Sequence, residues 1–319
     1  MIRILDTPWH QVHAYRLHSL PVRFTFAAIP HGGAYWNTAQ RPMPANFQGV
    51  MQVTDINPFD FDLALLHLDQ FCDRDPLRGL AFRVMRDRTQ DIPQIVIIHA
   101  TPDSEANRRR VLQLLGDLPA VCNSRQAARE WDGGEGRVDK YGLPQFKPII
   151  HGYRTNDFFN YPFERRRKEI FTICSGGSLS MEYHGLPLVR RLMRDVPMLW
   201  YGHNGNRRWL PNYYAYRDML ASSLIYFSPT RRGPMPGSRT EAALSGCCIV
   251  SVPGNDWESY IDHGKNGYIV HTYEEARTLL RALMLVPEMA YKVGQAGRKM
   301  AREKFNRDRF TSVWMQHIH

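Results

Sequence analysis

The 319-residue sequence has no apolar run of about 18 residues, the length at which a segment becomes a candidate membrane-spanning helix. Its first residues, MIRILDTPWH, lead straight into a strand-like stretch and do not have the form of a secretion signal. We therefore expect a cytoplasmic protein with neither a transmembrane helix nor a signal peptide. Peripheral attachment to a membrane remains open. Internal repeats are also absent, which argues against a repeat array.

Cysteines are few, and none forms a C-x-x-C pair. The five lie mainly in strand-like runs, so we expect reduced thiols in the protein core. Adjacent Cys247 and Cys248 should point to opposite faces of one strand. Thirteen histidines are present, but no H-x-x-x-H pair or cysteine–histidine spacing suggests a tetrahedral set of zinc ligands. We therefore predict no metal site.

Acidic residues are too few to balance the basic ones, and the net charge is +10. Such a chain attracts polyanions, so nucleic acid, an anionic membrane surface and a phosphorylated substrate are all candidate partners. The alternative is that arginine-rich helix faces simply keep the protein soluble. The basic clusters lie at 108–110, 165–168, 190–191, 207–208 and 231–232.

Strand-like and helical patterns alternate along the chain, which predicts an α/β protein with parallel sheets covered on both faces. The predicted strands are 2–5, 24–29, 50–54, 63–68, 94–98, 120–122, 147–150, 170–175, 198–201, 224–227 and 247–252. The predicted helices are 11–20, 78–88, 104–115, 124–131, 185–193, 213–221, 272–284, a helical pair over 287–305, and 307–318. Ser104, Ser124 and Thr272 are the expected helix caps. We divide the chain into a first domain (1–152), a connection (153–168), a second domain (169–304) and a last helix (305–319) that packs back on the first domain.

The stretch from 224 to 270 is the most informative part of the sequence. Two short apolar runs, predicted as strands, enclose a basic loop and a short helix that we expect Thr240 to cap and Glu241 to follow in the first turn. The loop should lie at the carboxyl end of a strand, where parallel sheets bind ligands. Arginines beside a helix start suit a diphosphate, although a solvated loop between core strands would read the same. The arginines of the loop are Arg231, Arg232 and Arg239.

Two segments here, RTEAALSGCCIVSVPG (239–254) and ESYIDHGKNGYIV (258–270), resemble a motif of the GT-B nucleotide-sugar glycosyltransferases. The similarity is to the large retaining family usually numbered four, also called glycosyl transferases group 1. It covers most of residues 60–310, and weaker matches lie at 95–99, 121–124, 149–158 and 288–305.

This resemblance implies two Rossmann-like domains facing a cleft, with a C-terminal helix crossing back. It implies a UDP- or GDP-sugar as donor substrate, bound mainly by the second domain, and no further cofactor. Glu241 would hold the ribose hydroxyls and Glu258 would line the nucleotide site. His99 would touch the sugar. The alternatives are a helix-dipole role for Glu241, a capping role for Glu258, and an ordinary strand-end histidine at position 99.

The sequence departs from the family pattern at the sugar and at the diphosphate. Gly233 stands where the family has the first glutamate of an E-x7-E pair. The usual arginine and lysine after the first strand of the second domain are also missing. Gly177, Ser178 and His184 occur there instead. Arg231, Arg232 or Arg239 would then supply the missing positive charge to the donor.

Retention by front-face attack, which the resemblance implies, needs stabilisation of charge at the diphosphate rather than paired carboxylates. For the acceptor side we single out Asp6 and His13 as candidates for base assistance. A purely structural role at strand ends is equally open for them. A hydroxymethylated base in DNA is slightly favoured as acceptor, and a lipid-linked or cell-surface glycan is the main alternative. A sugar-nucleotide 2-epimerase or a binding-only module of this fold remains a further alternative. The candidate acceptor contacts are His10, Trp9 and Trp36.

Overall fold

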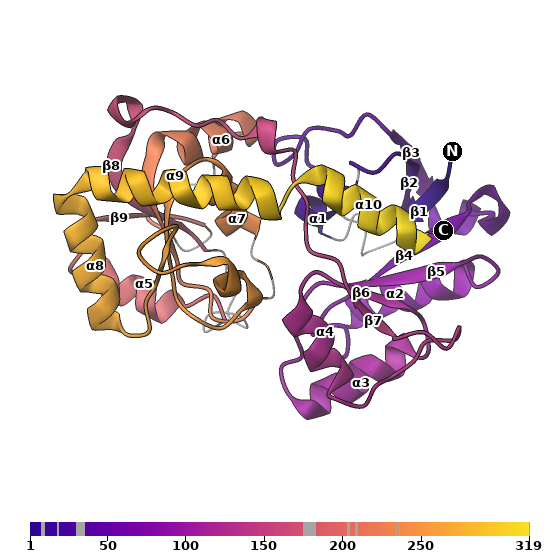
Figure 1. The fold of residues 1–319 in the computed structure, drawn as a ribbon. Helices are drawn as coiled ribbons and strands as arrows, with labels where there is room; N and C mark the ends of the chain where they lie inside the picture. The colour runs from indigo at the N-terminus through magenta and orange to yellow at the C-terminus, as the bar shows by residue number, and fades with distance from the viewer. Residues whose placement is uncertain are drawn as a thin grey trace. The chain divides into compact units, whose positions relative to one another are not determined.

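A computed structural model describes residues 1–7, 10–17, 19–29, 36–174, 183–202, 205–207, 210–233, 235 and 237–318. The chain forms two compact units (Figure 1). The first unit comprises Met1–Gly152 together with Arg307–His319, and the second comprises Tyr153–Asn306. Residues 153–168, which the sequence suggested as a connection, therefore lie within the second unit. No helix in the described ranges is long and apolar enough to cross a membrane.

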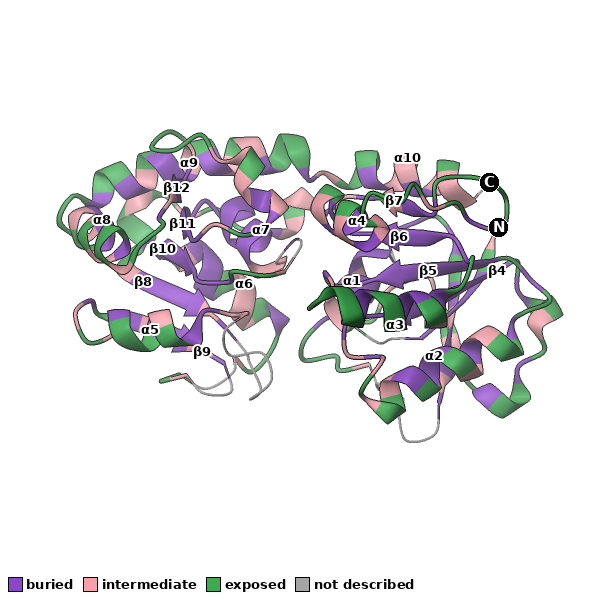
Figure 2. Ribbon diagram, turned by 90° about the horizontal axis from the view of Figure 1, so that it is seen from below, coloured by how far each residue is buried: buried purple, intermediate pink, exposed green. Residues whose placement is uncertain are grey.

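The first unit is built on a seven-stranded parallel sheet with strand order β3-β2-β1-β4-β5-β6-β7. Its strands are β1 (Arg3–Asp6), β2 (Arg23–Ala28), β3 (Phe47–Gln52), β4 (Leu63–Leu68), β5 (Gln94–Ile98), β6 (Ala120–Cys122) and β7 (Phe146–Pro148). Its helices are α1 (Gln11–Leu17), α2 (Pro76–Arg88), α3 (Glu105–Leu115), α4 (Arg125–Asp132) and α10 (Arg307–Ile318). Strands β4 and β5 are buried along their whole length, which explains their continuous apolar sequences (Figure 2).

The second unit has a five-stranded parallel sheet with strand order β12-β11-β10-β8-β9. Its strands are β8 (Arg167–Ile173), β9 (Met198–Tyr201), β10 (Ser223–Ser228), β11 (Cys248–Ser251) and β12 (Tyr268–Ile269). Its helices are α5 (Leu186–Leu192), α6 (Tyr213–Ser222), α7 (Gly237–Leu244), α8 (Tyr273–Leu285) and α9 (Pro287–Lys304). Both units thus have the α/β architecture that the alternating pattern predicts.

Three expected helix caps are present. The side chains of Ser104, Ser124 and Thr272 accept backbone N–H groups at the starts of α3, α4 and α8. The expected cap at Thr240 is wrong, because α7 begins at Gly237 and Thr240 lies inside it. All five cysteines are free and buried, as predicted.

The helical pair expected over 287–305 is a single helix, α9. Its glycines are packing positions and not breaks. A Cβ atom on Gly294 would lie 2.3 Å from the carbonyl oxygen of Gly246. The missing side chain therefore lets α9 press against the turn between α7 and β11.

Candidate functional site

The strand order of the second unit changes direction at β8. The chain goes from β8 to β9 on one side and then returns to β10 on the other. In parallel sheets such a switch point leaves a crevice at the carboxyl ends of the two strands. The segments that follow β8 and β10 meet there, since the backbone N–H of Arg231 donates to the Tyr183 carbonyl over 2.8 Å. Gly185 has φ +67°, and a Cβ there would lie 2.1 Å from the Pro229 oxygen.

A cavity of about 550 Å³ opens at this meeting point. Both arginines that line it are exposed, so their guanidinium groups can receive an anion. Arg232 also lies over the Tyr183 ring, 5.6 Å from its centroid. The described lining residues are Tyr183, Gly185, Pro187, Leu188, Arg231 and Arg232.

Of the predicted donor residues after β8, only His184 can be placed; Gly177 and Ser178 lie outside the described residues. The His184 ring is half-buried, and burial lowers its pKa below the usual value. A neutral imidazole at this place offers a hydrogen bond to a ligand, and the positive charge must come from the arginines.

Arg239 does not lie in the loop, contrary to the expectation from sequence. It belongs to α7 and is fully buried. Its Nε donates to Ser228 Oγ over 2.9 Å and its Nη1 donates to Asn255 Oδ1 over 2.6 Å. Burial lowers its pKa to about 10, since a charge is costly away from water. Arg239 therefore ties the end of β10 to the loop after β11, and it contacts no solvent.

Glu241 and Thr240 are also buried in α7. The carboxylate of Glu241 accepts a hydrogen bond from the Tyr216 hydroxyl, with 2.5 Å between Oε2 and the phenolic oxygen. Thr240 Oγ1 accepts from the indole N–H of Trp257 over 2.8 Å. Thr240 thus serves packing between α7 and the following loop. The sequence did not single out Tyr216 as a partner of Glu241.

Glu258 closes a capping box at the start of a short 3-10 helix (Asp256–Tyr260). Its two carboxylate oxygens accept the backbone N–H groups of Gly254, over 2.9 Å, and Asn255, over 3.1 Å. This is the capping role that the sequence left open. Gly254, at φ +132°, lies so near that a Cβ would be 1.9 Å from the Arg231 carbonyl oxygen. The capped loop therefore supports the arginine loop from below.

The first unit has its own switch point, between β1 and β4, and a line of polar side chains follows the carboxyl ends there. Asp6 ends β1, His67 lies near the end of β4, and His99 directly follows β5. His67 Nε2 lies 2.6 Å from Asp6 Oδ1, and His67 Nδ1 lies 2.7 Å from His99 Nε2. The two rings are nearly coplanar, at 11°. Asp6 and His67 are buried, and His99 is partly exposed.

A second line of polar groups runs beside the first. Arg16 Nη1 lies 2.8 Å from His151 Nδ1, and His151 Nε2 lies 3.0 Å from His13 Nδ1. His13 in turn meets His99 edge to face, with ring centroids 4.9 Å apart. Burial lowers the pKa of His13, His99 and His151 well below the usual imidazole value. The three rings are therefore neutral at pH 7.

Two of the predicted acceptor contacts can be located. The His10 ring stacks on His99 with centroids 5.5 Å apart, which places it at the histidine cluster. Trp36 is half-buried, stacks on Phe26, and donates its indole N–H to the Arg41 carbonyl over 2.9 Å. Trp9 lies outside the described residues. His10 thus joins the cluster of Asp6, His13 and His99, whereas Trp36 has a packing role.

The sequence did not assign roles to His67, His151 or Arg16. The available signal was positional, since His67 and His151 each stand at or just after a strand end. Across the described residues, no group of three or more histidine, cysteine, aspartate or glutamate side chains is arranged to hold a metal ion.

Residues 177–315 match the protein family described as "Glycosyl transferase-like". The structure is similar to that of Anabaena Alr3699/HepE, crystallised with UDP-glucose, with a TM-score of 0.75 and 11% identity over 100% of this chain and 99% of that one. It is similar to sucrose-phosphate synthase from Thermosynechococcus elongatus, with a TM-score of 0.66 and 12% identity over 99% of this chain and 98% of that one. A Rickettsia africae glycosyltransferase matches with a TM-score of 0.64, 12% identity, and 99% and 97% coverage. No curated protein matches the sequence.

These likenesses show that the chain has the GT-B fold. With the family match on the second unit, they identify a glycosyltransferase, and the resemblance drawn from the sequence is confirmed.

Proposed function

We propose that this protein transfers a sugar from a nucleotide-diphosphate sugar to a hydroxyl group, with the donor bound by the second unit. The observation that carries the proposal is the cavity at the β8–β10 switch point, with Arg231 and Arg232 in its wall. A diphosphate carries the charge that these guanidinium groups complement. Anabaena HepE, which has the same fold, was crystallised with UDP-glucose and with UDP and glucose. UDP-sugars are therefore the first donors to test, and GDP-sugars the second.

The proposed roles follow from charge and position. Arg231 and Arg232 bind the diphosphate, and Glu241 receives the ribose hydroxyls once the Tyr216 hydroxyl gives way. Gly177, Ser178 and His184 complete the donor site from the other loop. Charge stabilisation at the leaving diphosphate is the main catalytic term, consistent with front-face attack and retention. No added cofactor enters this scheme.

The proposed sugar side of the site lacks the glutamate that the family has at the position of Gly233. Gly233 is half-buried and follows directly on the arginine pair. A glutamate here would place a negative charge next to the guanidinium groups. Its absence leaves the whole positive field of the loop to the donor diphosphate.

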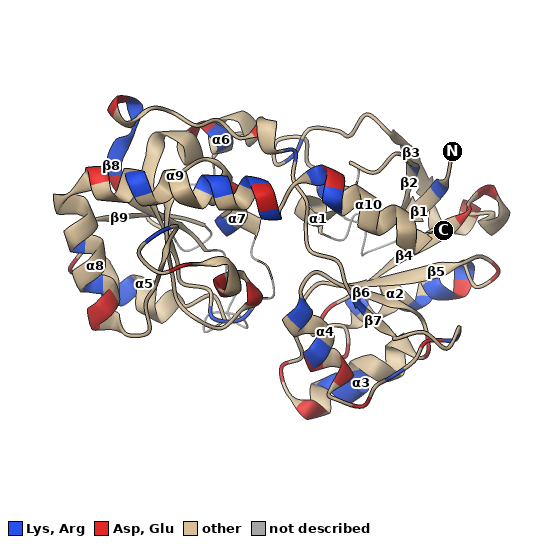
Figure 3. Ribbon diagram, viewed as in Figure 1, with Lys and Arg blue, Asp and Glu red and all other residues tan. Residues whose placement is uncertain are grey.

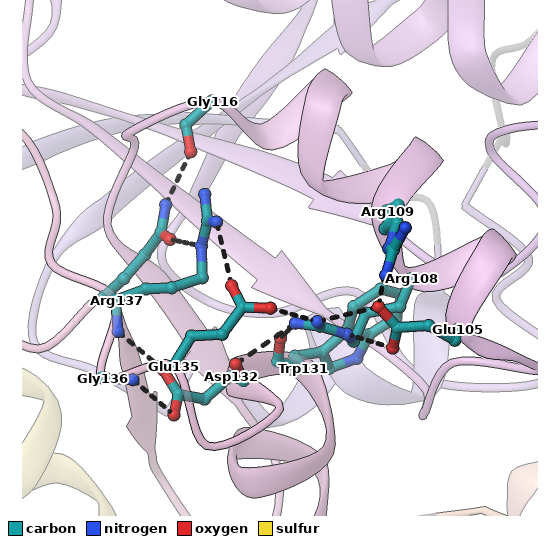
Figure 4. A network of polar contacts seen from close by, with 10 residues as sticks. Glu105, Arg108, Arg109, Gly116, Trp131, Asp132, Glu135, Gly136 and Arg137 are labelled. Carbon is teal, nitrogen blue, oxygen red and sulfur yellow. Dashed lines mark hydrogen bonds and ion pairs between the residues drawn. The ribbon is translucent and has the colours of Figure 1, made fainter.

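The acceptor is the least constrained part of the proposal. A hydroxymethylated base in DNA stays our first candidate because basic residues are spread over both units (Figure 3). A lipid-linked or cell-surface glycan is the alternative. One observation favours the alternative: Arg108 and Arg109 pair with Glu105, and Arg108 also pairs with Glu135 (Figure 4). Charge that is balanced in this way adds little to polyanion binding.

The donor test compares binding of UDP-sugars and GDP-sugars by calorimetry, followed by donor kinetics. Arg231→Ala should raise the donor KM by about tenfold to a hundredfold, because a charge-assisted hydrogen bond contributes about 1.5–3 kcal/mol. Arg302→Ala, which removes an exposed arginine on α9, is the matched control and should leave the KM unchanged. If no nucleotide sugar binds, or if both variants behave alike, the donor site is wrong.

The acceptor test supplies labelled donor with hydroxymethylated duplex DNA or with a glycan acceptor. Label in DNA, together with binding that weakens steeply with salt, supports the DNA proposal. Label in the glycan supports the alternative. Conversion of the donor to an isomeric nucleotide sugar without any acceptor would indicate the epimerase.

A further inference from the structure

The hydrogen bonds of the first histidine line fix where its protons lie. A carboxylate only accepts, so His67 Nε2 carries the proton shared with Asp6 Oδ1. In a neutral His67 ring, Nδ1 is then a bare acceptor, and His99 Nε2 must donate to it. A neutral His99 therefore has an unprotonated Nδ1. Within the described residues, no hydrogen-bond partner is found for His99 Nδ1.

The second line leads to the opposite result. A guanidinium only donates, so His151 Nδ1 accepts from Arg16 Nη1. Neutral His151 then carries its proton on Nε2 and donates it to His13 Nδ1. His13 is left with its proton on Nε2, and this atom is buried with no hydrogen-bond partner among the described residues.

We propose that Asp6 with His67, and Arg16 with His151, are positioning residues that present a fixed acceptor (His99 Nδ1) and a fixed donor (His13 Nε2–H) to a sugar hydroxyl. The inference rests on the proposed transfer reaction and names the hydroxyl-recognition residues in the first unit. The chemistry is that of one hydroxyl group, which both donates and accepts. The hydroxyl belongs either to the sugar of the donor or to the acceptor molecule.

Two features distinguish this arrangement from ordinary core packing. The first is cost, because Asp6 Oδ2 and His13 Nε2 are buried and unpaired in the described part of the chain, and such atoms usually mark a function. The second is convergence. The ends of the two lines meet, with the His13 and His99 rings 4.9 Å apart at 89°. A chain of bonds built only for stability would have no reason to end in a bare acceptor beside a bare donor.

The direct test is a nitrogen NMR spectrum of the full chain labelled at its histidines, which reports the protonation of each ring nitrogen without any turnover. His99 should show an unprotonated Nδ1 and His13 a protonated Nε2. Addition of UDP-glucose or of the acceptor should shift the resonances of these two nitrogens. A protonated Nδ1 on His99 would mean that His67 is an imidazolium, and it would overturn the proposal.

A variant links the protons to binding. In Asp6→Asn the amide can donate as well as accept, so the tautomer of His99 is no longer fixed. This variant should show partial protonation of His99 Nδ1 and a KM about tenfold to a hundredfold higher for one substrate. Asp91→Asn, at an exposed site of the same unit, is the control.

The substrate whose KM rises identifies the source of the hydroxyl, donor sugar or acceptor. A folded Asp6→Asn protein with both KM values unchanged would overturn the proposal. Failure of the proposed transfer reaction is a separate outcome, because the wild-type chain would then transfer no sugar while the NMR protonation pattern would still be measurable.

Discussion

Acid should destabilise the first unit at pH values where most proteins remain stable. His13 and His151 are buried, and their pKa values lie well below that of a free imidazole. The groups that face them add to this effect. His13 meets His99 and His151, and Arg16 holds its charge against His151. The unfolded chain therefore binds more protons than the folded chain once the pH falls below the free imidazole value, and stability is lost as the pH falls.

The size of the loss follows from linkage. An imidazole that titrates near 6.5 when unfolded and stays neutral when folded lowers the free energy of unfolding by about 2 kcal/mol between pH 7 and pH 5. His13 and His151 together should cost roughly 4 kcal/mol, a large part of the stability of a typical domain. The effect should come from the first unit, where this cluster lies.

Guanidinium unfolding at pH 7 and at pH 5, followed by hydrogen exchange to separate the two units, measures this loss. His151→Gln should be less stable than the wild type at pH 7, but its stability should fall less steeply with acid, by about 1.4 kcal/mol per pH unit. His271→Gln removes an exposed imidazole and should leave the slope unchanged. Equal slopes for the wild type and His151→Gln would show that the buried imidazole takes up a proton in the folded state, and would refute the reasoning.

Two further predictions concern the second unit. Arg239→Met should lower its free energy of unfolding by about 1–3 kcal/mol, because the loss of two charge-assisted hydrogen bonds exceeds the relief of a buried charge; an unchanged stability in urea would contradict this. Gly185→Ala should lower donor affinity measured by calorimetry, because its Cβ would push Pro229 and the arginine loop away. Gly136→Ala, at φ +63° with open space around it, is the matched control and should lose only about 1–2 kcal/mol of stability from backbone strain.

Most of the fold could be predicted because its signals are local. The strands Leu63–Leu68, Gln94–Ile98, Ala120–Cys122 and Met198–Tyr201 have the predicted bounds, since each is a short apolar run. The serine caps of α3 and α4 were equally readable. The start of α7 was missed because Gly237 and Ser238 gave no apolar period, and a threonine further on looked like a cap. The glycines of α9 resembled breaks because the close contact they permit comes from a distant part of the chain.

The site was less predictable because its roles depend on burial and on distant partners. Sequence placed His99 and Asp6 at strand ends, yet the link between them passes through His67 on a third strand. Asp6 is fully buried, so it can reach a substrate only through His67 and His99. No spacing in one sequence reveals that Tyr216 meets Glu241, because the two residues lie on different helices.

Charge shows the same limit, and it bears on the acceptor. Arg231 and Arg239 are eight positions apart around one loop, but the first is exposed and the second is fully buried. Arg166 is likewise buried, and its guanidinium donates to the carbonyl oxygens of Tyr161, Ser223 and Ser245. A net charge of +10 therefore includes cations that serve internal bonding and release no counterions on binding. If DNA is the acceptor, the salt dependence of binding should reflect only the exposed arginines and lysines, and it should be shallower than the composition implies.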